Sequence, residues 1–563
     1  MNQTSRFATI ANPAHDWWRK TLDRPRKLIL VIASLLAFAP LMFSSATNVY
    51  ITPNGSGQGA CTTNPQTPAW FNNAANWGNG SSQIGPGTVV TICGTFTGTN
   101  GASEFTFQGS GAVGAPVELL FGTNATLTAG YWGGNGAIAT NGNSHLLIDG
   151  GTTCGWVNQA ETGCNGGITA TANGSNLTNQ QASIGVEVNG GTDIEVRNLS
   201  ITNMFVQVIN QSTASWGNAG AMAAIDSRNA SSLLIHNNFV SQAHAGYQIE
   251  YNSGTTTNVQ IYNNVSQSMC AGYTTPSGGT SPALNTILIH DNESVDGKNW
   301  DAADNGCHED HFHGWAEAGG NGGTVSGMQI YNNYFHGDLG CHQNGYIYFE
   351  ADMGVNDSAK YFNNLLVNTS DNSTCNGPWA YPPSGYVGLK GPNCGSATLI
   401  ANNTIIGNTT QTNQPNAGVL LEGSCSNVTV NNNIIDTVGT FIVTNDSGST
   451  LAASDENDFY NGNNDWNFKG EDESSFAAWK SACNCDSHSS VGNPNLSSQY
   501  ELQSGSAAIS LGTNLTSAAI VSLDSDKAGI PRAVSGSWDS GAYVYSTGNA
   551  LPSPPSGLAA QVK

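Results

Sequence analysis

Residues 232–240, Ser-Leu-Leu-Ile-His-Asn-Asn-Phe-Val, join alternating apolar positions to an asparagine pair and a second short β-prone run. The same arrangement recurs along the middle of the chain, at Asn237–Asn238, Asn263–Asn264, Asp291–Asn292, Asn332–Asn333, Asn363–Asn364, Asn402–Asn403 and Asn431–Asn432. The second members lie 26, 28, 41, 31, 39 and 29 residues apart, so a fixed core carries insertions of variable length. This spacing predicts a solenoid whose insertions form loops on one face, where binding sites usually lie.

Each repeat contains three short runs with the alternation of β-strands, and none has a helical period. The third run precedes the next unit, as in residues 246–250, 345–350, 385–390 and 418–422. Three strands per turn predict an all-β fold, a parallel β-helix. Asparagine tolerates the left-handed backbone of a sharp corner, and its amide can bond to the same residue one coil away. We therefore expect an asparagine ladder at one corner.

With this pattern the chain resembles a right-handed parallel β-helix protein of the pectate-lyase-like superfamily, of the secreted bacterial type, from about Asn48 to about Tyr545. Residues 70–77 resemble the short cap helix at the N-terminal end, and residues 84–92 resemble the first strand. Residues 476–480, 494, 500–502 and 538–543 resemble the closing segment at the C-terminal end. The expected organisation is a signal peptide (1–46), an N-terminal cap with the first strand (47–97), the β-helix (98–470), a closing segment (471–548) and a Pro/Ser-rich tail (549–563).

The N-terminus has the pattern of an export signal. Arg24, Arg26 and Lys27 precede an apolar stretch over residues 28–43, and Ser44-Ser45-Ala46 fits a small-residue cleavage site. An uncleaved membrane anchor is the alternative, but the stretch is interrupted by Pro40 and is short for a span of ~20 residues. We expect a secreted protein, extracellular or periplasmic, without a stable membrane span after cleavage.

Composition supports this view and limits the possible partners. The chain has 68 Gly and 20 Pro for many tight turns, while charged residues make up only 10% of it and its net charge is −23. Without residues 1–46, 10 basic residues remain against 37 acidic ones. We expect no nucleic-acid partner, because phosphate binding needs clustered Lys and Arg, and the remaining sequence has no such cluster. We expect a monomer.

All twelve cysteines follow the signal, and an even number in a secreted chain predicts disulfides. Equivalent positions of adjacent coils lie close enough for a direct bridge. The expected pairs are Cys61–Cys93, Cys154–Cys164 and Cys394–Cys425, and pairing among Cys270, Cys307, Cys341 and Cys375 stays open.

Residues with acid–base chemistry gather in residues 305–315 and 336–342. Imidazole and carboxylate side by side can bind a divalent metal or share proton transfer near neutral pH. The candidate catalytic residues are Asp310, His311, His313, Glu350 and Lys390.

Strand geometry makes two predictions for these candidates. Alternation places His311 and His313 on one face of their strand, and Asp310 with Phe312 on the other. If Asp310 aligns with residue 345, Trp315 lies beside Glu350, and Lys390 falls one coil further on.

Two structural interpretations compete with a functional site. In the first, His308 and His342 only bond loop backbone while Cys307 and Cys341 form a disulfide between coils. In the second, the repeated Cys-His pair binds structural zinc, for which two thiolates and two imidazoles suffice. A secreted chain favours the disulfide.

Aromatic side chains frame the same region. Sugar rings present flat apolar faces that stack on aromatic rings, although packing in the core is an equally good reason for such residues. The candidate substrate-binding residues are Trp300, Trp315, Tyr348 and Trp379.

The resemblance implies a polysaccharide ligand, bound in a groove along the parallel strands. A calcium-dependent lyase with an arginine base is disfavoured, because no arginine lies between Arg228 and Arg532. Residues 350–352 (Glu-Ala-Asp) with Lys360 are similar to the paired calcium ligands and lysine base of chondroitinase-B-like lyases, although their spacing differs. Residues Asp301, Asp304 and Asp310 with His311 are similar in inventory to the carboxylates and histidine of polygalacturonases.

Two functions therefore stand. The first is a secreted polysaccharide-degrading enzyme, a lyase or a glycoside hydrolase, for which Ca²⁺ is a possible cofactor and no metal ligand is assigned. The second is a non-catalytic cell-surface or glycan-binding solenoid. Convergence of the histidines and carboxylates in a groove would favour the enzyme. Burial of these residues among hydrogen bonds to loop backbone would favour the non-catalytic solenoid.

Overall fold

The computed structural model describes residues 48–157, 160–172, 183–204, 223–278, 281–297, 308–316, 322–339, 343–369, 385–408, 417–463 and 465–546. They belong to one compact unit that spans residues 45–563. Within the described residues no helix is both long enough and apolar enough to cross a membrane.

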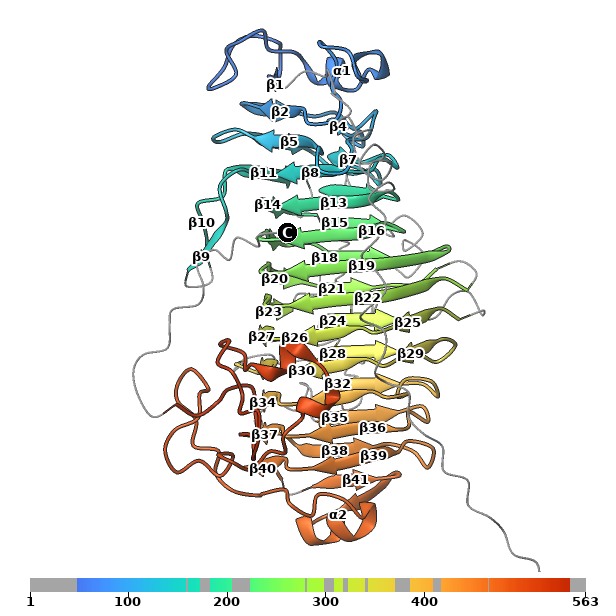
Figure 1. Ribbon diagram of the computed structural model, residues 1–563, viewed down its shortest axis with the longest axis vertical. Coiled ribbons are helices and arrows are strands. Elements are labelled where there is room, and N and C mark those ends of the chain that lie inside the picture. The colour runs from blue at the N-terminus through green and yellow to red at the C-terminus, as the bar shows by residue number, and fades with distance from the viewer. Residues whose placement is uncertain are drawn as a thin grey trace, which may run out of the picture. The chain divides into compact units, whose positions relative to one another are not determined.

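Successive coils stack their strands into three parallel sheets (Figure 1). The first sheet contains, in order, β1 (Asn48–Ile51), β2 (Val89–Ile92), β5 (Val117–Phe121), β8 (Leu146–Asp149), β13 (Thr192–Arg197), β16 (Ser231–His236), β19 (Thr255–Tyr262), β22 (Ala283–His290), β26 (Gln329–Tyr331), β30 (Lys360–Phe362), β33 (Leu399–Ala401), β36 (Val428–Asn431) and β39 (Leu451–Asp455), with β25 (Thr324–Ser326) and β29 (Val355–Asp357) at its side.

The second sheet contains β3 (Thr95–Thr97), β6 (Thr126–Ala129), β11 (Gly166–Ala170), β14 (Leu199–Thr202), β17 (Phe239–Ser241), β20 (Val265–Met269), β23 (Glu293–Gly297), β27 (Tyr334–His336), β31 (Leu365–Val367), β34 (Thr404–Ile406), β37 (Ile434–Asp436) and β40 (Asp458–Tyr460). The third sheet contains β4 (Phe105–Thr106), β7 (Ile138–Ala139), β12 (Val186–Asn189), β15 (Ala223–Arg228), β18 (Ala245–Glu250), β21 (Ala271–Thr275), β24 (Asp310–Trp315), β28 (Gly345–Glu350), β32 (Gly385–Lys390), β35 (Ala417–Glu422), β38 (Thr440–Thr444), β41 (Trp466–Phe468) and β42 (Glu471–Glu473). A short hairpin of β9 (Gly155–Val157) and β10 (Ala160–Thr162) lies outside these sheets.

This is the parallel β-helix that the repeat predicted, right-handed as the resemblance implied, and β42 alone in the three sheets runs antiparallel to its neighbour, β41, among the described strands. The interior holds rows of equivalent apolar side chains, because alternate residues of every strand face inward. One such row in the first sheet runs Ile235, Ile261, Ile289, Ile330, Tyr361, Ile400 and Val430, all with no exposed surface.

The asparagine ladder is confirmed at the corner between the first and second sheets, and the two asparagines of a pair have different tasks. The first member has left-handed backbone, as in Asn237 (φ 57°) and Asn363 (φ 54°). The second member is buried and bonds to its neighbour: Asn333 donates its main-chain N–H and its side-chain amide to Asn364 Oδ1, at 3.1 and 3.0 Å. The ladder runs through Asn238, Asn264, Asn292, Asn333, Asn364, Asn403, Asn433 and Asn457.

One of the predicted pairs was wrong. Residues 431–433 are all asparagine, and the structure uses Asn432 (φ 59°) at the corner and Asn433 in the ladder, one residue later than predicted. The ladder also gains a last member, Asn457, which follows Glu456 (φ 55°) and therefore lacks the asparagine pair that marks the other units.

The N-terminal end differs in detail from the expectation. A four-residue helix, α1 (Pro68–Phe71), and a 3-10 turn at Ala74–Asn76 occupy the predicted helical region. Thr67 caps α1 by accepting the N–H of Trp70, and Phe71 packs against Phe105 in the core. Strand β1 precedes this helix and pairs with β2, so the first sheet begins one strand earlier than residues 84–92 suggested. That the helix closes the end of the solenoid stays a prediction.

Helix α2 (Phe476–Cys483) begins after Ser475, whose hydroxyl accepts the N–H of Ala478. The segment that follows includes 3-10 turns at Thr516–Ala518 and Val521–Asp524, and it lies beside later coils of the β-helix (Figure 1). There it contacts the first members of the asparagine pairs. Lys527 donates to the Asn332 carbonyl, Arg532 NH2 to Asn363 Oδ1 at 2.8 Å, and Asn432 Nδ2 to the Thr513 carbonyl at 2.8 Å.

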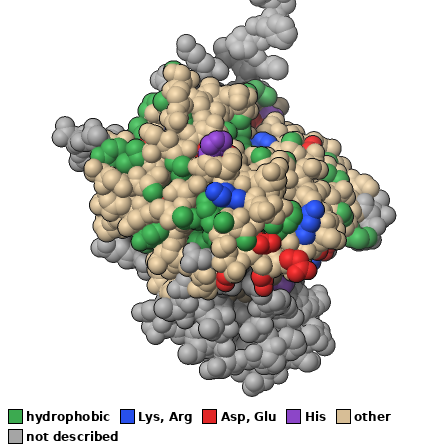
Figure 2. Space-filling model, turned by 90° about the horizontal axis from the view of Figure 1, so that it is seen from below, with side chains coloured by type: hydrophobic (Ala, Val, Ile, Leu, Met, Phe, Trp, Pro, Cys, Tyr) green, Lys and Arg blue, Asp and Glu red, His purple; other side chains and the backbone are tan. Residues whose placement is uncertain are grey.

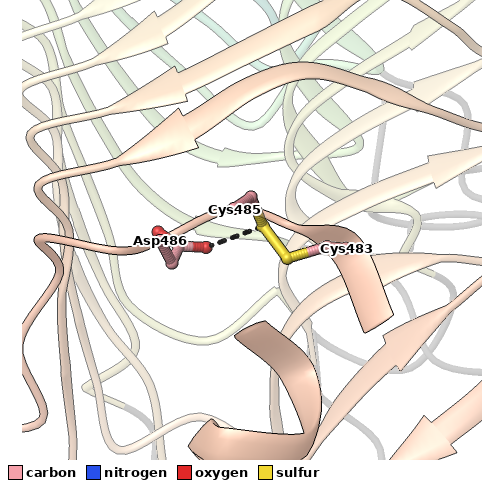
Figure 3. Close-up of side chains that lie close together, drawn as sticks. All are labelled: Cys483, Cys485 and Asp486. Atoms are coloured by element: carbon pink, nitrogen blue, oxygen red, sulfur yellow. Dashed lines mark hydrogen bonds between the residues drawn. A yellow bond between two sulfur atoms is a disulfide. The ribbon is translucent and has the colours of Figure 1, made fainter. Parts of the chain in front are cut away.

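All three disulfides predicted from sequence are present: Cys61–Cys93, Cys154–Cys164 and Cys394–Cys425. A fourth joins Cys483 to Cys485 at the end of α2 (Figure 3). Cys270 is disulfide-bonded as well, whereas Cys307, Cys341 and Cys375 lie outside the described residues. The expected disulfide or zinc site at Cys307 and Cys341 therefore stays a prediction.

Candidate functional site

The outer face of the third sheet brings several of the predicted residues together. Trp315 on β24 lies beside Glu350 on β28, and Glu350 lies beside Lys390 on β32, as the predicted register requires. The next residue in this row is Glu422 on β35, and a parallel row contains His313 and Tyr348. The predicted register is thus confirmed. On this face the stacked strands bring together residues as far apart in the sequence as His313 and Glu422, which are separated by 109 positions.

Asp310 and His313 form a buried pair at the centre of this face. His313 Nδ1 lies 2.9 Å from Asp310 Oδ2, and the Asp310 side chain has no exposed surface. The carboxylate also accepts the main-chain N–H groups of Asn344 and Gly345, at 2.7 and 2.8 Å. His313 Nε2, although buried, has no hydrogen-bond partner among the described residues. The imidazole is therefore held through one nitrogen, while its other nitrogen is buried without a hydrogen-bond partner among the described residues.

The predicted alternation along β24 was wrong. Asp310 contacts His313, which alternation had placed on the opposite face, while His311 and Phe312 are both in the interior. Strand β24 starts at the corner where the chain enters the third sheet, and strict alternation does not hold across a bend. A dyad that the sequence pattern argued against is therefore formed.

His311 is a core residue and does not join His313 on the outer face. Its Nδ1 lies 2.7 Å from Ser294 Oγ, and its ring packs against Phe335 and Tyr346. Burial lowers the pKa of His311 well below its usual value, with the charge of His336 acting in the same direction. His311 is thus buried in the core and its neutral form is favoured, and a catalytic role for it stays a prediction.

Lys390 is held between two carboxylates. Its Nζ lies 3.3 Å from Glu350 Oε1 and 2.9 Å from Asp352 Oδ2. Partial burial alone would lower the pKa of Lys390, but the hydrogen bonds and charges of Asp352 and Glu350 raise it above its usual value. Lys390 is therefore an ammonium ion at neutral pH and cannot remove a proton there.

Lys360 takes no part in this group, so the predicted likeness to a paired calcium site with a lysine base does not hold for it. It belongs to β30 of the first sheet, where it donates to the Ala397 carbonyl. Lys390, 40 residues after Glu350, occupies the position beside the two carboxylates instead.

The aromatic candidates that the structure describes are partly committed to packing. Trp315 is half-buried and meets the His313 ring edge-on, with centroids 5.0 Å apart. Tyr348 is 4% exposed and donates its hydroxyl to Glu422 Oε1 at 2.6 Å. Its ring lies over Gly388, where a Cβ would come within 2.5 Å of it. Trp300 and Trp379 lie outside the described residues, and sugar binding by any of the four stays a prediction.

A second polar group on the same sheet was missed from the sequence. Arg228 on β15 lies 2.8 Å from Asp226, 3.4 Å from Glu187 on β12 and 3.2 Å from Glu250 on β18. Gln248 bonds to both Asp226 and Glu250. The signal was present, because residues 223–228 and 245–250 both place polar residues at alternate positions, and aligning these two runs would have stacked Asp226 on Gln248 and Arg228 on Glu250.

Burial raises the pKa of Asp226 to about 7, and the charge of Glu250 adds to the shift while Arg228 opposes it. Burial also raises the pKa of Glu187, again opposed by Arg228. At neutral pH this group can therefore donate as well as accept hydrogen bonds.

Carboxylate oxygens that suit Ca²⁺ are present around both Arg228 and Lys390, but in each group they already neutralise the Arg or the Lys.

Two further clusters of possible metal ligands lie near the C-terminal end of the coils. Asp455, Glu456 and His488 lie within reach of one another on the surface. Cys483 and Cys485 lie beside Asp486, but their sulfurs are bonded to each other and so cannot serve as thiolate ligands (Figure 3).

Comparison with known proteins adds no assigned activity. No protein-family model and no curated protein matches the chain. Among solved structures, it is similar to the pectate lyase Pel9A, with a TM-score of 0.43 and 13% identity over 89% of this chain and 97% of that one.

Two other similar structures have different functions. One is the GH136 lacto-N-biosidase of Eubacterium ramulus, with a TM-score of 0.41 and 12% identity over 74% of this chain and 64% of that one. The other is a double mutant of the tailspike protein of E. coli bacteriophage HK620, with a TM-score of 0.40 and 9% identity over 69% and 68%. These similarities are too distant to assign the chain a family or an activity, and its parallel β-helix is shown by the stacked sheets themselves.

Proposed function

We propose that this protein is a secreted carbohydrate-active enzyme that binds a polysaccharide along the outer face of the third sheet and cleaves it. The observation that supports this proposal is the Asp310–His313 pair with its unpartnered, buried Nε2. A buried polar atom without a partner costs free energy, so such an atom on an outer sheet face indicates a role in function. Lys390, Glu350 and Glu422 lie on the next three coils.

In this proposal His313 transfers the proton. Asp310, an acceptor, binds the Nδ1–H tautomer and leaves the Nε2 lone pair free to take a proton from water or from a substrate carbon. Lys390 stays protonated and therefore binds substrate oxygen rather than acting as the base. His311 has no part in the reaction. Glycan cleavage by either hydrolysis or elimination needs a base of this kind.

A non-catalytic glycan-binding solenoid is the second candidate. The observation that favours it is the extent to which the predicted site is satisfied internally: Tyr348 is bonded to Glu422, His336 to Glu293 and His311 to Ser294. Such a protein would bind glycan on the same face and release no product.

Activity on a panel of neutral and uronate polysaccharides, with Ca²⁺ or EDTA, tests the proposal. Reducing ends without new ultraviolet absorbance identify a hydrolase, and absorbing unsaturated products identify a lyase. The variant His313→Ala should lose at least ~100-fold in kcat while binding of the polymer is retained, because it lacks the proton-transfer group.

The matched control is His488→Ala, which removes a histidine that also lies 2.8 Å from an aspartate, Asp455, but is largely exposed and on another part of the surface. It should leave activity unchanged. Full activity of His313→Ala would refute the proposed role of the dyad, and glycan binding by the parent protein without any product would favour the second candidate.

A further inference from the structure

The outer face of the third sheet has an unusual charge balance. Seven carboxylates of the described residues lie along its stretch from β12 to β35: Glu187, Asp226, Glu250, Asp310, Glu350, Asp352 and Glu422. The cations on the same face are Arg228 and Lys390. Carboxylates thus exceed cations by five on the face where the proposed substrate lies.

Both cations are already neutralised. Arg228 lies within 3.4 Å of three carboxylates, and Lys390 lies within 3.3 Å of two. Neither has charge left to bind an acidic ligand without giving up a carboxylate partner. An acidic substrate would have to replace an existing ion pair, which gains little.

The other cations that the structure describes lie elsewhere. Arg197 and Lys360 belong to the first sheet, and Lys527 and Arg532 bind the asparagine corner. Lys469 lies in the turn between β41 and β42, at the C-terminal end of the third sheet and beyond the stretch from β12 to β35, and Lys480 lies on α2. Seen from that end of the molecule, Lys and Arg side chains lie apart from one another and acidic side chains gather in one place (Figure 2). Lys298 lies outside the described residues.

From this balance we infer that the site takes a neutral glycan, rich in hydroxyl groups, and not a polyuronate. The inference rests on the proposed function and specifies its substrate class. A polyuronate carries a carboxylate on every ring, and these would approach the partly buried carboxylates of this face, where like charges repel. Sugar hydroxyls, in contrast, donate hydrogen bonds that carboxylates accept well.

Two groups on this face can bind hydroxyls, one around Arg228 and one around Lys390. Five coil steps separate β15 from β32, or about 24 Å at ~4.8 Å per step. The distance suits an oligosaccharide of several rings that lies along the sheet. The Asp310–His313 pair is on β24, between the two groups.

If the substrate is a neutral glycan, the type of cleavage follows from its chemistry. Elimination needs a carboxyl group beside the carbon that loses its proton, and a neutral sugar has none. Cleavage is then hydrolysis: the oxygen of water bonds to the anomeric carbon, one proton of water goes to the base, and the leaving oxygen takes up a proton as its bond to carbon breaks. No oxidant, reductant or other reactant is consumed.

Binding of neutral and uronate oligosaccharides to the full-length secreted protein tests the inference, with Ca²⁺ or EDTA and between about 0.05 M and about 0.3 M NaCl. Neutral ligands should bind with a Kd that changes less than ~2-fold with salt. Oligogalacturonate should bind at least ~10-fold more weakly, even with Ca²⁺. Tighter binding of oligogalacturonate than of the neutral ligands, or its cleavage, would overturn the inference. If that cleavage required His313, the proposed function would still stand. Binding of neither class would overturn both.

A gain-of-function variant tests the charge argument directly. The double change Glu350→Gln and Asp352→Asn leaves Lys390 without a carboxylate partner. Affinity for oligogalacturonate should rise at least ~5-fold and become sensitive to salt. The control Glu195→Gln removes one of two carboxylates from Arg197 on the first sheet and should bring no gain. A double variant that folds like the parent but gains no affinity would overturn the inference.

Discussion

Removal of one buried member of the asparagine ladder should destabilise the solenoid by several kcal/mol. Asn364 accepts two hydrogen bonds from Asn333, at 3.1 and 3.0 Å, and donates two, to the Ile330 carbonyl and to Asn403 Oδ1, at 2.8 and 3.0 Å. Asn364→Ala loses all four. The backbone does not oppose the change, because the left-handed residue of this pair is Asn363.

The size of the effect follows from these bonds. Four hydrogen bonds contribute ~1 kcal/mol each, and the main-chain N–H of Asn333, left buried without its partner, adds ~1–3 kcal/mol. The expected loss in the free energy of unfolding is thus about 5–7 kcal/mol. Denaturant unfolding followed by circular dichroism measures it, and hydrogen exchange at the Asn333 amide should accelerate strongly, since that group loses its acceptor.

The control is Asn135→Ala, which changes an exposed asparagine and should cost less than ~0.5 kcal/mol. A loss below ~2 kcal/mol for Asn364→Ala, with unchanged exchange at Asn333, would refute the assignment of the ladder as a main source of cohesion between coils. The same result would show that apolar stacking and the main-chain hydrogen bonds of the sheets suffice to hold these coils together.

Three further changes test other parts of the structure. Burial raises the pKa of Asp226 to about 7 in the folded protein, so its ionisation destabilises the fold progressively as pH rises from about 4 to about 7. The Tm of Asp226→Asn relative to the parent should therefore increase with pH over this range, and a constant difference would contradict the raised pKa. Gly388→Ala places a Cβ 2.5 Å from the Tyr348 ring and should cost ~1–3 kcal/mol, a loss that a second change, Tyr348→Leu, should relieve. Arg532→Ala removes the bond to Asn363 and should speed limited proteolysis within residues 512–546 while circular dichroism of the β-helix is retained; unaltered cleavage would argue against this contact as an anchor.

The sequence predicted the fold because a corner of a β-helix imposes a local requirement that few residues meet. Left-handed backbone at the first position and a buried amide at the second both favour asparagine, so the pair marks each coil. The same logic explains the two errors. Three consecutive asparagines at 431–433 allow two registers, and only the backbone conformation distinguishes them. At Asn457 the preceding corner residue is Glu456, so no pair is visible.

Within the candidate site, the sequence predicted the positions that the register of stacked strands determines. It did not predict the positions at the corner where β24 begins. Trp315, Glu350 and Lys390 were aligned correctly because parallel strands keep their register over several coils. His311 was misplaced because strict alternation was applied across the start of β24. Arg228 and its carboxylates were overlooked because they lie two to four coils before the histidine-rich stretch, whose composition had suggested a site.

The C-terminal segment 513–541, which lies back along the β-helix, affects how the protein unfolds. In a solenoid each coil touches only its neighbours, so the end coils can fray one after another. Here residues 513–541 bind the corner asparagines at 332, 363, 402 and 432 from outside, across four coils. The coils cannot unfold one by one from the C-terminal end until residues 513–541 detach. The four coils that this segment binds should therefore unfold together. A pulling or proteolysis experiment should show this as one abrupt step rather than a graded series.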